Sequence, residues 1–196
     1  MILPIVAYGD PVLRKVAEEI DKEYPKLDEL VANMWETMYN ANGVGLAAPQ
    51  IGLGIRLFII DTSAFADDED LSEEEQNALK DFKRVFINAR IEEETGKEWI
   101  FNEGCLSIPD VREDVARMDT LTISYLDGDF KARKETYDGL LARVIQHEYD
   151  HIEGILFTDK LSALKKRLLK GRLTNISKGN IKVEYRMSYP QQKKAR

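Results

Sequence analysis

The chain of 196 residues has only two histidines, His147 and His151, and they enclose Glu148 in the run His147-Glu148-Tyr149-Asp150-His151. Residues four apart face the same side of a helix, so two such imidazoles can bind one metal ion. A glutamate between them lies close enough to exchange a proton with a water on that ion. The pattern also arises by chance in ordinary helices. Because this chain places all its histidines in it, the spacing predicts a metal-dependent hydrolase.

The third ligand decides the reaction class. Downstream of His151 the only glutamates are Glu153, which is too close on the same helix, and Glu184. Upstream is the sole cysteine, Cys105, in Glu103-Gly104-Cys105-Leu106-Ser107. A lone cysteine is ordinarily a small buried hydrophobe. Flanked by glycine and proline in a chain with paired histidines, it becomes a candidate ligand, and a Cys/His/His set leaves one tetrahedral position open for water.

A glycine-rich segment runs from Gly43 to Gly52, Gly-Val-Gly-Leu-Ala-Ala-Pro-Gln-Ile-Gly. Its first six residues match a dinucleotide-binding fingerprint. That function needs a strand before the glycines and a helix after them. Here a helix precedes them and Pro49 follows, so nucleotide binding is disfavoured. The alternatives are a flexible loop, or a segment where Gly45 admits an extended substrate and Gln50 points into the site.

Composition indicates an ordinary globular protein, with 43% hydrophobic and 32% charged residues, and the length suits one domain over 1–196. One cysteine indicates a reducing compartment. The apolar start, Met1 to Ala7, is too short for a membrane span and has no basic leader, so we expect a cytoplasmic protein. The net charge of −7 hides an acidic run at 67–75, interpreted as a surface loop, and a C-terminal extension over 160–196 with 12 Lys/Arg and one acid.

Hydrophobic periodicity predicts the elements that must position these groups. A helix over 26–41 is expected to end at Asn42-Gly43 with a left-handed glycine, and a helix over 138–151 carries the histidines. Its Arg143 is expected to pack its stem and extend its head to solvent. The expected strands are 55–61, 85–91 and a hairpin of 120–126 with 130–137; the basic tail should form a helix from 159 and a strand over 181–186.

Three segments, taken in their order along the chain, together resemble the peptide deformylase family: Gly43 to Gln50, Glu103 to Ser107 and Gln146 to His151. The departures are Ile152, where the family usually has leucine, and the acidic run at 67–75. The resemblance implies an α+β fold with antiparallel sheets around a central metal-binding helix. It also implies removal of the formyl group from the N-terminal formylmethionine of newly made polypeptides, releasing formate.

The resemblance further implies a role for each matching residue. Cys105, His147 and His151 would bind the metal, and Glu148 would act as general base and acid for the metal-bound water. The side-chain amide of Gln50 and the backbone N–H of Leu106 would stabilise the oxyanion. The expected substrate contacts are Val44, Gly45 and Gly104 along the peptide, Leu140 and Val144 in the methionine pocket, and Arg112 at its rim. Fe²⁺ is the metal that the family favours, while the ligand set also suits Zn²⁺, Ni²⁺ or Co²⁺.

Two other classes stay open from the residues alone. A metalloendopeptidase would share the histidine pair but lacks a downstream third ligand. A structural metal site in a binding module would need a fourth cysteine or histidine. The basic extension is interpreted as a solvated helix face or, alternatively, as a surface that docks on ribosomal RNA. Neither DNA nor a membrane is expected as a partner.

Overall fold

The computed structural model describes residues 1–66, 69 and 71–190. The strands are β1 (Ile5–Val6), β2 (Gly45–Ala47), β3 (Leu57–Asp61), β4 (Lys83–Cys105), β5 (Ile108–Leu126), β6 (Ala132–Asp138) and β7 (Met187–Ser188). The α-helices are α1 (Leu27–Asn40), α2 (Glu73–Lys80), α3 (Gly139–Ile152) and α4 (Ala163–Ser177). Short 3-10 helices are η1 (Pro11–Arg14), η2 (Ala48–Ile51), η3 (Ser63–Phe65) and η4 (Phe157–Lys160).

The main sheet has five antiparallel strands in the order β2-β3-β4-β5-β6. Each strand pairs with the next in sequence, so the sheet needs no crossover connections. A separate parallel pair joins β1 to β7, with Ile5 opposite Met187. The α+β fold predicted from the sequence is confirmed.

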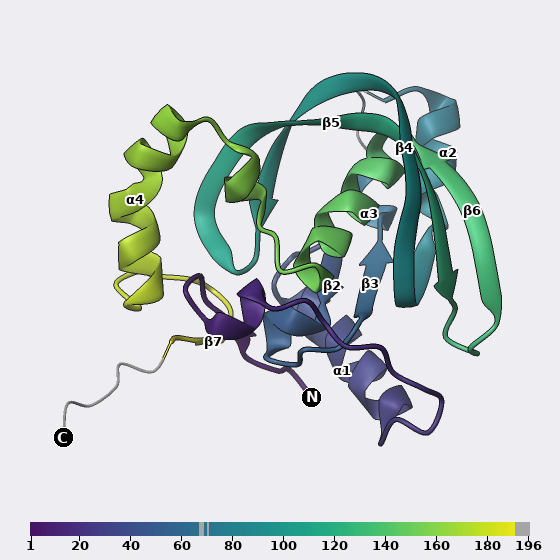
Figure 1. Ribbon diagram of the computed structural model, residues 1–196, viewed down its shortest axis with the longest axis horizontal. Helices are drawn as coiled ribbons and strands as arrows, with labels where there is room; N and C mark the ends of the chain where they lie inside the picture. The colour runs from purple at the N-terminus through teal and green to yellow at the C-terminus, as the bar shows by residue number, and fades with distance from the viewer. Residues whose placement is uncertain (67–68, 70, 191–196) are drawn as a thin grey trace.

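The long strands β4 and β5 curve around α3, which lies at the centre of the molecule (Figure 1). Their pairing has several register shifts, including one between Ile87 and Arg90 and another between Thr95 and Glu98. Such shifts bend and twist a strand pair. On the inner surface of the curve, Phe86 of β4 and Leu121 of β5 share a core cluster with α3. The helix contributes Ala142, Val144 and Ile145 to it. The curved sheet therefore fixes α3 while leaving its C-terminal half for the histidines.

Helix α1 buries Met34 and Met38. The residue that reverses the chain after this helix differs from the prediction. Asn42, with φ of 54°, takes the left-handed conformation, while Gly43 does not. The N–H of Gly43 donates to the carbonyl of Met38 at 2.9 Å, and the chain then enters β2.

Two sequence predictions are wrong at element level. The acidic run at 67–75 is not a loop throughout, because Ser72 caps α2 and Glu73 begins its first turn. Acidic side chains in a first turn complement the positive end of the helix dipole. Of the acidic run, residues 67, 68 and 70 lie outside the described residues. No strand forms over 181–186 in the described chain, and β7 begins at Met187.

Helix α4 lies at the periphery, on the opposite side of the molecule from α2 (Figure 1). Leu173 and Ile176 anchor it in a core cluster with Val6, Leu13 and Phe157. The remaining residues of the tail, 191–196, lie outside the described part. No helix among the described residues has the length and apolar character needed to cross a membrane.

Candidate active site

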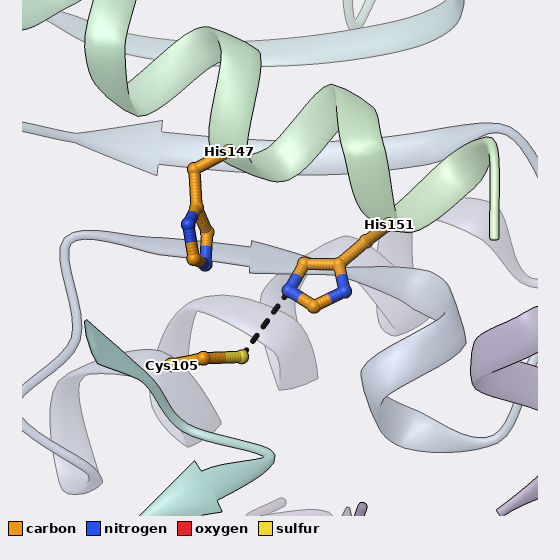
Figure 2. Close-up of side chains that lie close together, drawn as sticks. All are labelled: Cys105, His147 and His151. Atoms are coloured by element: carbon orange, nitrogen blue, oxygen red, sulfur yellow. Dashed lines mark hydrogen bonds between the residues drawn. The ribbon is translucent and has the colours of Figure 1, made fainter. Parts of the chain in front are cut away.

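The three candidate ligands converge from two elements. His147 and His151 extend from one face of α3 toward Cys105, the last residue of β4 (Figure 2). One ligand atom from each residue lies within 4.8 Å of the others. The Cys105 Sγ lies 3.3 Å from the His151 Nε2.

These separations fit a single divalent ion. Tetrahedral coordination with a metal–sulfur bond of about 2.3 Å and metal–nitrogen bonds of about 2.0 Å places ligand atoms about 3.5 Å apart. One thiolate and two imidazoles form a donor set that Fe²⁺, Zn²⁺, Ni²⁺ and Co²⁺ accept. Because the protein supplies three ligands here, a fourth position stays open for substrate or water.

The pKa values of the two histidines shift in opposite directions. Burial lowers the pKa of His151 well below its usual value, so its imidazole is neutral and ready to ligate. Burial acts in the same direction on His147, but hydrogen bonds to Cys105 and Glu103 outweigh it and raise the pKa of His147 to about 10 in the metal-free protein. A metal ion that binds here must displace the proton from the His147 imidazole.

Glu103 orients the His147 ring by contacting its Nδ1. Its Oε2 lies 2.9 Å from the His147 Nδ1, which directs the Nε2 toward Cys105. Arg117 binds the same carboxylate with two N–H groups, at 2.7 and 3.0 Å, and Arg143 donates to it at 2.9 Å. Burial alone would raise the pKa of Glu103, yet the hydrogen bonds from His147 and Arg117 lower it well below its usual range. Glu103 is therefore an ionised anchor for His147, a candidate metal ligand.

The prediction that the Arg143 head reaches solvent is wrong. Arg143 is 1% exposed and donates to the carbonyl groups of Val115 and Trp99 as well as to Glu103. Its guanidinium lies 4.5 Å from the centre of the Trp99 ring. The long side chain spans the space between α3 and the curved strands, where backbone carbonyls and a carboxylate satisfy its charge.

Glu148 is 4% exposed and faces the cleft from α3. Its Oε2 is buried and has no hydrogen-bond partner among the described residues. Burial raises the pKa of Glu148 to about 7, against the opposing charge of His147. A carboxyl group with a pKa near neutrality suits a group that must accept and return a proton.

Gln50 and Leu106 flank Cys105. The Gln50 Oε1 accepts the N–H of Ala47 at 2.8 Å, which turns the amide NH₂ toward the site, 3.5 Å from the Cys105 Sγ. Leu106 follows the cysteine directly and lines the same cleft. Both potential donors therefore lie beside the ligand atoms.

The cleft at the ligands has a volume of about 690 Å³. Of the substrate contacts predicted from sequence, the structure places Val44, Gly45, Gly104, Arg112 and Val144 on its walls. Leu140 is not among the residues that line this cleft, and its place in the methionine pocket stays a prediction. It lies in the first turn of α3, almost two turns before His147.

At two glycines that line the cleft, neighbouring side chains occupy the space where a side chain of that residue would lie. A side chain at Gly104 would begin 2.9 Å from the Arg112 Nη1, and one at Gly43 would begin 2.8 Å from the Leu106 Cδ1. Arg112 is held over Gly104 by two hydrogen bonds to Asn102, at 2.6 and 2.9 Å. The glycines thus let neighbouring side chains form the cleft surface.

Sequence reasoning missed one wall of the cleft. Lys182, Val183, Glu184 and Tyr185 line it from the C-terminal segment. The alternation of Ile181, Val183 and Tyr185 with charged residues was a usable signal, since these three are partly buried and their neighbours are exposed. The same alternation predicts a strand over 181–186, which the structure does not form there.

A Cys/His/His set with an open position beside a buried carboxylate is the arrangement of a hydrolytic metal centre. Residues 2–167 match the polypeptide deformylase family. The chain belongs to the peptide deformylase family, whose metal-dependent enzymes remove the N-formyl group from nascent peptides.

Relatives support this assignment over the whole chain. The chain is 67% identical over its full length to the full-length peptide deformylase of Christiangramia forsetii, and 65% identical to that of Flavobacterium johnsoniae, again over the full length of both. The crystal structure of a peptide deformylase from Legionella pneumophila superposes with a TM-score of 0.77 at 37% identity, covering 92% of this chain and 98% of that one. The Thermotoga maritima enzyme gives a TM-score of 0.70 at 33% identity, covering 83% and 99%.

Proposed function

We propose that the chain acts as a single catalytic domain in which Cys105, His147 and His151 hold one divalent metal ion for the deformylation of N-formylmethionyl peptides. The observation that carries this proposal is the approach of the three ligand atoms to within 4.8 Å of one another next to the buried Glu148 carboxylate. Cytoplasmic nascent chains are the natural substrate, because they carry the formyl group when they are made.

The residues divide the chemistry among them. A bound divalent ion would polarise the formyl carbonyl and make water a stronger nucleophile. Glu148 takes the proton from the attacking water and delivers it to the leaving amine. The Gln50 Nε2 and the Leu106 N–H donate to the developing oxyanion, a contribution of about 3 kcal/mol per donor in other enzymes.

Substrate alignment uses the edge of the main sheet. Strand β2 is at one end of the strand order and carries Gly45, with Val44 just before it. An extended peptide can add to such an edge through main-chain hydrogen bonds. Gly104 also lines the cleft, Val144 offers an apolar wall for the methionine side chain, and Arg112 is the proposed rim contact.

Formate release from a formyl-Met tripeptide tests the assignment, with mass spectrometry of the same sample to detect internal cleavage. We expect formate without backbone cleavage. Glu148→Ala should keep the metal and lose turnover, whereas Cys105→Ser should lose the metal. A fully active Glu148→Ala enzyme would contradict the proton-transfer role, and backbone cleavage without formate would indicate an endopeptidase.

Fe²⁺ is the metal that we propose for the active enzyme, because a site with one thiolate and two imidazoles accepts it and the family resemblance favours it. Purification without oxygen, followed by metal analysis and activity measurement, tests this. Greater turnover with Fe²⁺ than with Zn²⁺, and its decline in air, are the expected results. Equal, air-stable turnover with both ions would argue against iron.

A second proposal concerns the basic extension, which we propose docks on the ribosome. Helix α4 exposes Lys166, Arg167, Lys170 and Arg172, and a groove of about 560 Å³ beside it is lined by the first three. Phosphate groups of RNA would be attracted to this face. Reversing the charges of Arg167, Lys170 and Arg172 should abolish salt-sensitive co-sedimentation with ribosomes while formate release from a free peptide is unchanged. Undiminished binding would reject this role.

A further inference from the structure

The turn that follows Cys105 is held on several sides. It consists of Leu106 and Ser107, between the paired residues Cys105 and Ile108 of β4 and β5. The Leu106 side chain packs against Gly43. The Ser107 carbonyl accepts the Tyr8 N–H at 2.8 Å, and the Leu106 carbonyl accepts the Tyr185 hydroxyl at 2.7 Å.

Tyr185 reaches this turn from a segment that is itself fastened to the N-terminal segment. The residue after it, Arg186, accepts the Ile5 N–H at 2.9 Å, and the pairing continues from Ile5–Met187 to Val6–Ser188. The two segments that contact the turn are therefore joined to each other. Tyr185 also lines the cleft, so its hydroxyl is anchored within the site rather than on the outer surface.

We propose that Tyr185 is a positioning residue for deformylation, because its hydroxyl holds the Leu106 carbonyl and so fixes the orientation in which the Leu106 N–H meets the oxyanion. This inference rests on the proposed role of that N–H. The N–H and the carbonyl of Leu106 belong to the two peptide planes that meet at the Leu106 Cα, so a carbonyl that is held in place limits the backbone rotations by which the N–H could turn. A free carbonyl at Leu106 would let the turn rock about the ligand Cys105 and weaken a donor whose value depends on being preorganised.

Tyr185→Phe removes one oxygen and keeps the ring that lines the cleft. Tyr189→Phe is the matched control, since Tyr189 lies on the same segment but packs against Gly179 in a separate core cluster. Loss of one hydrogen bond corresponds to about a five- to tenfold fall in rate. We expect kcat for a formyl-Met tripeptide to fall by this factor in Tyr185→Phe, with KM, metal content and the midpoint of thermal unfolding close to wild type.

Hydrogen exchange gives a readout independent of turnover. In zinc-loaded protein, the Leu106 amide should exchange faster in Tyr185→Phe than in wild type or Tyr189→Phe. Unchanged kcat and unchanged exchange in Tyr185→Phe would overturn the inference. So would a parallel loss of metal, thermal stability and activity, since that outcome assigns Tyr185 a general structural role. An inactive wild-type enzyme would instead contradict the proposed function, which keeps the two failures apart.

Discussion

The carboxylate of Glu148 occupies the space that a side chain at Gly45 would take. A Cβ built on Gly45 would lie 2.7 Å from the Glu148 Cδ. The edge strand that is proposed to align the substrate and the group proposed to move its proton are thus in direct contact. Glycine at this position is required by the Glu148 carboxylate, in addition to any approach of the substrate.

Gly45→Ala should therefore impair turnover without removing the metal. The added methyl group must push Glu148 away, and a displacement of about 1 Å in a reacting group can reduce the rate about 100-fold. Steady-state kinetics with metal analysis measures this. Gly54→Ala is the control, because a Cβ there meets nothing within 4 Å. A Gly45→Ala enzyme with wild-type kcat would show that Glu148 tolerates the shift.

Gln50→Ala should reduce kcat by about 100- to 1000-fold if its amide stabilises the oxyanion. The ground-state carbonyl carries less charge, so KM should change less. Metal content should remain, because Gln50 contacts the Cys105 sulfur only as a donor, at 3.5 Å. If kcat/KM falls entirely through KM, Gln50 binds substrate and transition state equally.

Glu103→Gln should weaken both the fold and the metal site. The change leaves the buried guanidinium groups of Arg117 and Arg143 without their shared carboxylate, and breaking a buried pair costs about 3–5 kcal/mol. The amide keeps one accepting oxygen where His147, Arg117 and Arg143 use both oxygens of the carboxylate, so the weaker support of His147 should lower metal affinity about 10- to 100-fold. Denaturant unfolding and metal competition with a chelator measure the two effects. Glu94→Gln is the control, because Glu94 is exposed. Equal metal affinity in Glu103→Gln and Glu94→Gln would show that His147 binds the metal without support from the Glu103 carboxylate.

Glu135 should contribute stability that depends on pH. Burial alone raises its pKa, but hydrogen bonds from Tyr125 and Tyr137 outweigh it and lower the pKa below the usual 4.5. Its contribution is therefore present above about pH 4.5 and lost as the pH falls through the lowered value. In urea unfolding of metal-free protein, the stability difference between wild type and Glu135→Gln should shrink as the pH falls from about 6 to about 3, a range that includes the usual glutamate pKa of about 4.5. A constant difference would mean that the two tyrosines do not favour the ionised form.

Local sequence patterns predicted the helices better than the strands. Helices expected over 26–41 and 138–151 are found at Leu27–Asn40 and Gly139–Ile152. The first buries Met34 and Met38 on one face, whereas the second is buried on most sides. Strand β4 was expected over 85–91 but extends to Cys105. Its middle, residues 92–98, is exposed throughout, so no alternation marks it, and only pairing with β5 makes it a strand.

The site was predictable to the extent that its residues occur in short motifs. Cys105, Glu148 and the histidines could be named from spacing and type. The burial of Arg143 could not, because its partners Glu103, Val115 and Trp99 come from strands more than 25 residues away in sequence. Tyr185 was missed for the same reason, since it contacts Leu106 across 79 positions.

The parallel pairing of β1 with β7 has a consequence for synthesis of the enzyme itself. The turn beside Cys105 is contacted by residue 8 and by residue 185, so nearly the whole chain must emerge before both contacts can form. Closing such a long loop is entropically costly and slow compared with forming α3. A chain still being translated would hold its histidines on a folded helix while the donor at Leu106 stays loosely placed. Activity should therefore appear only after Tyr185 has emerged and reached Leu106.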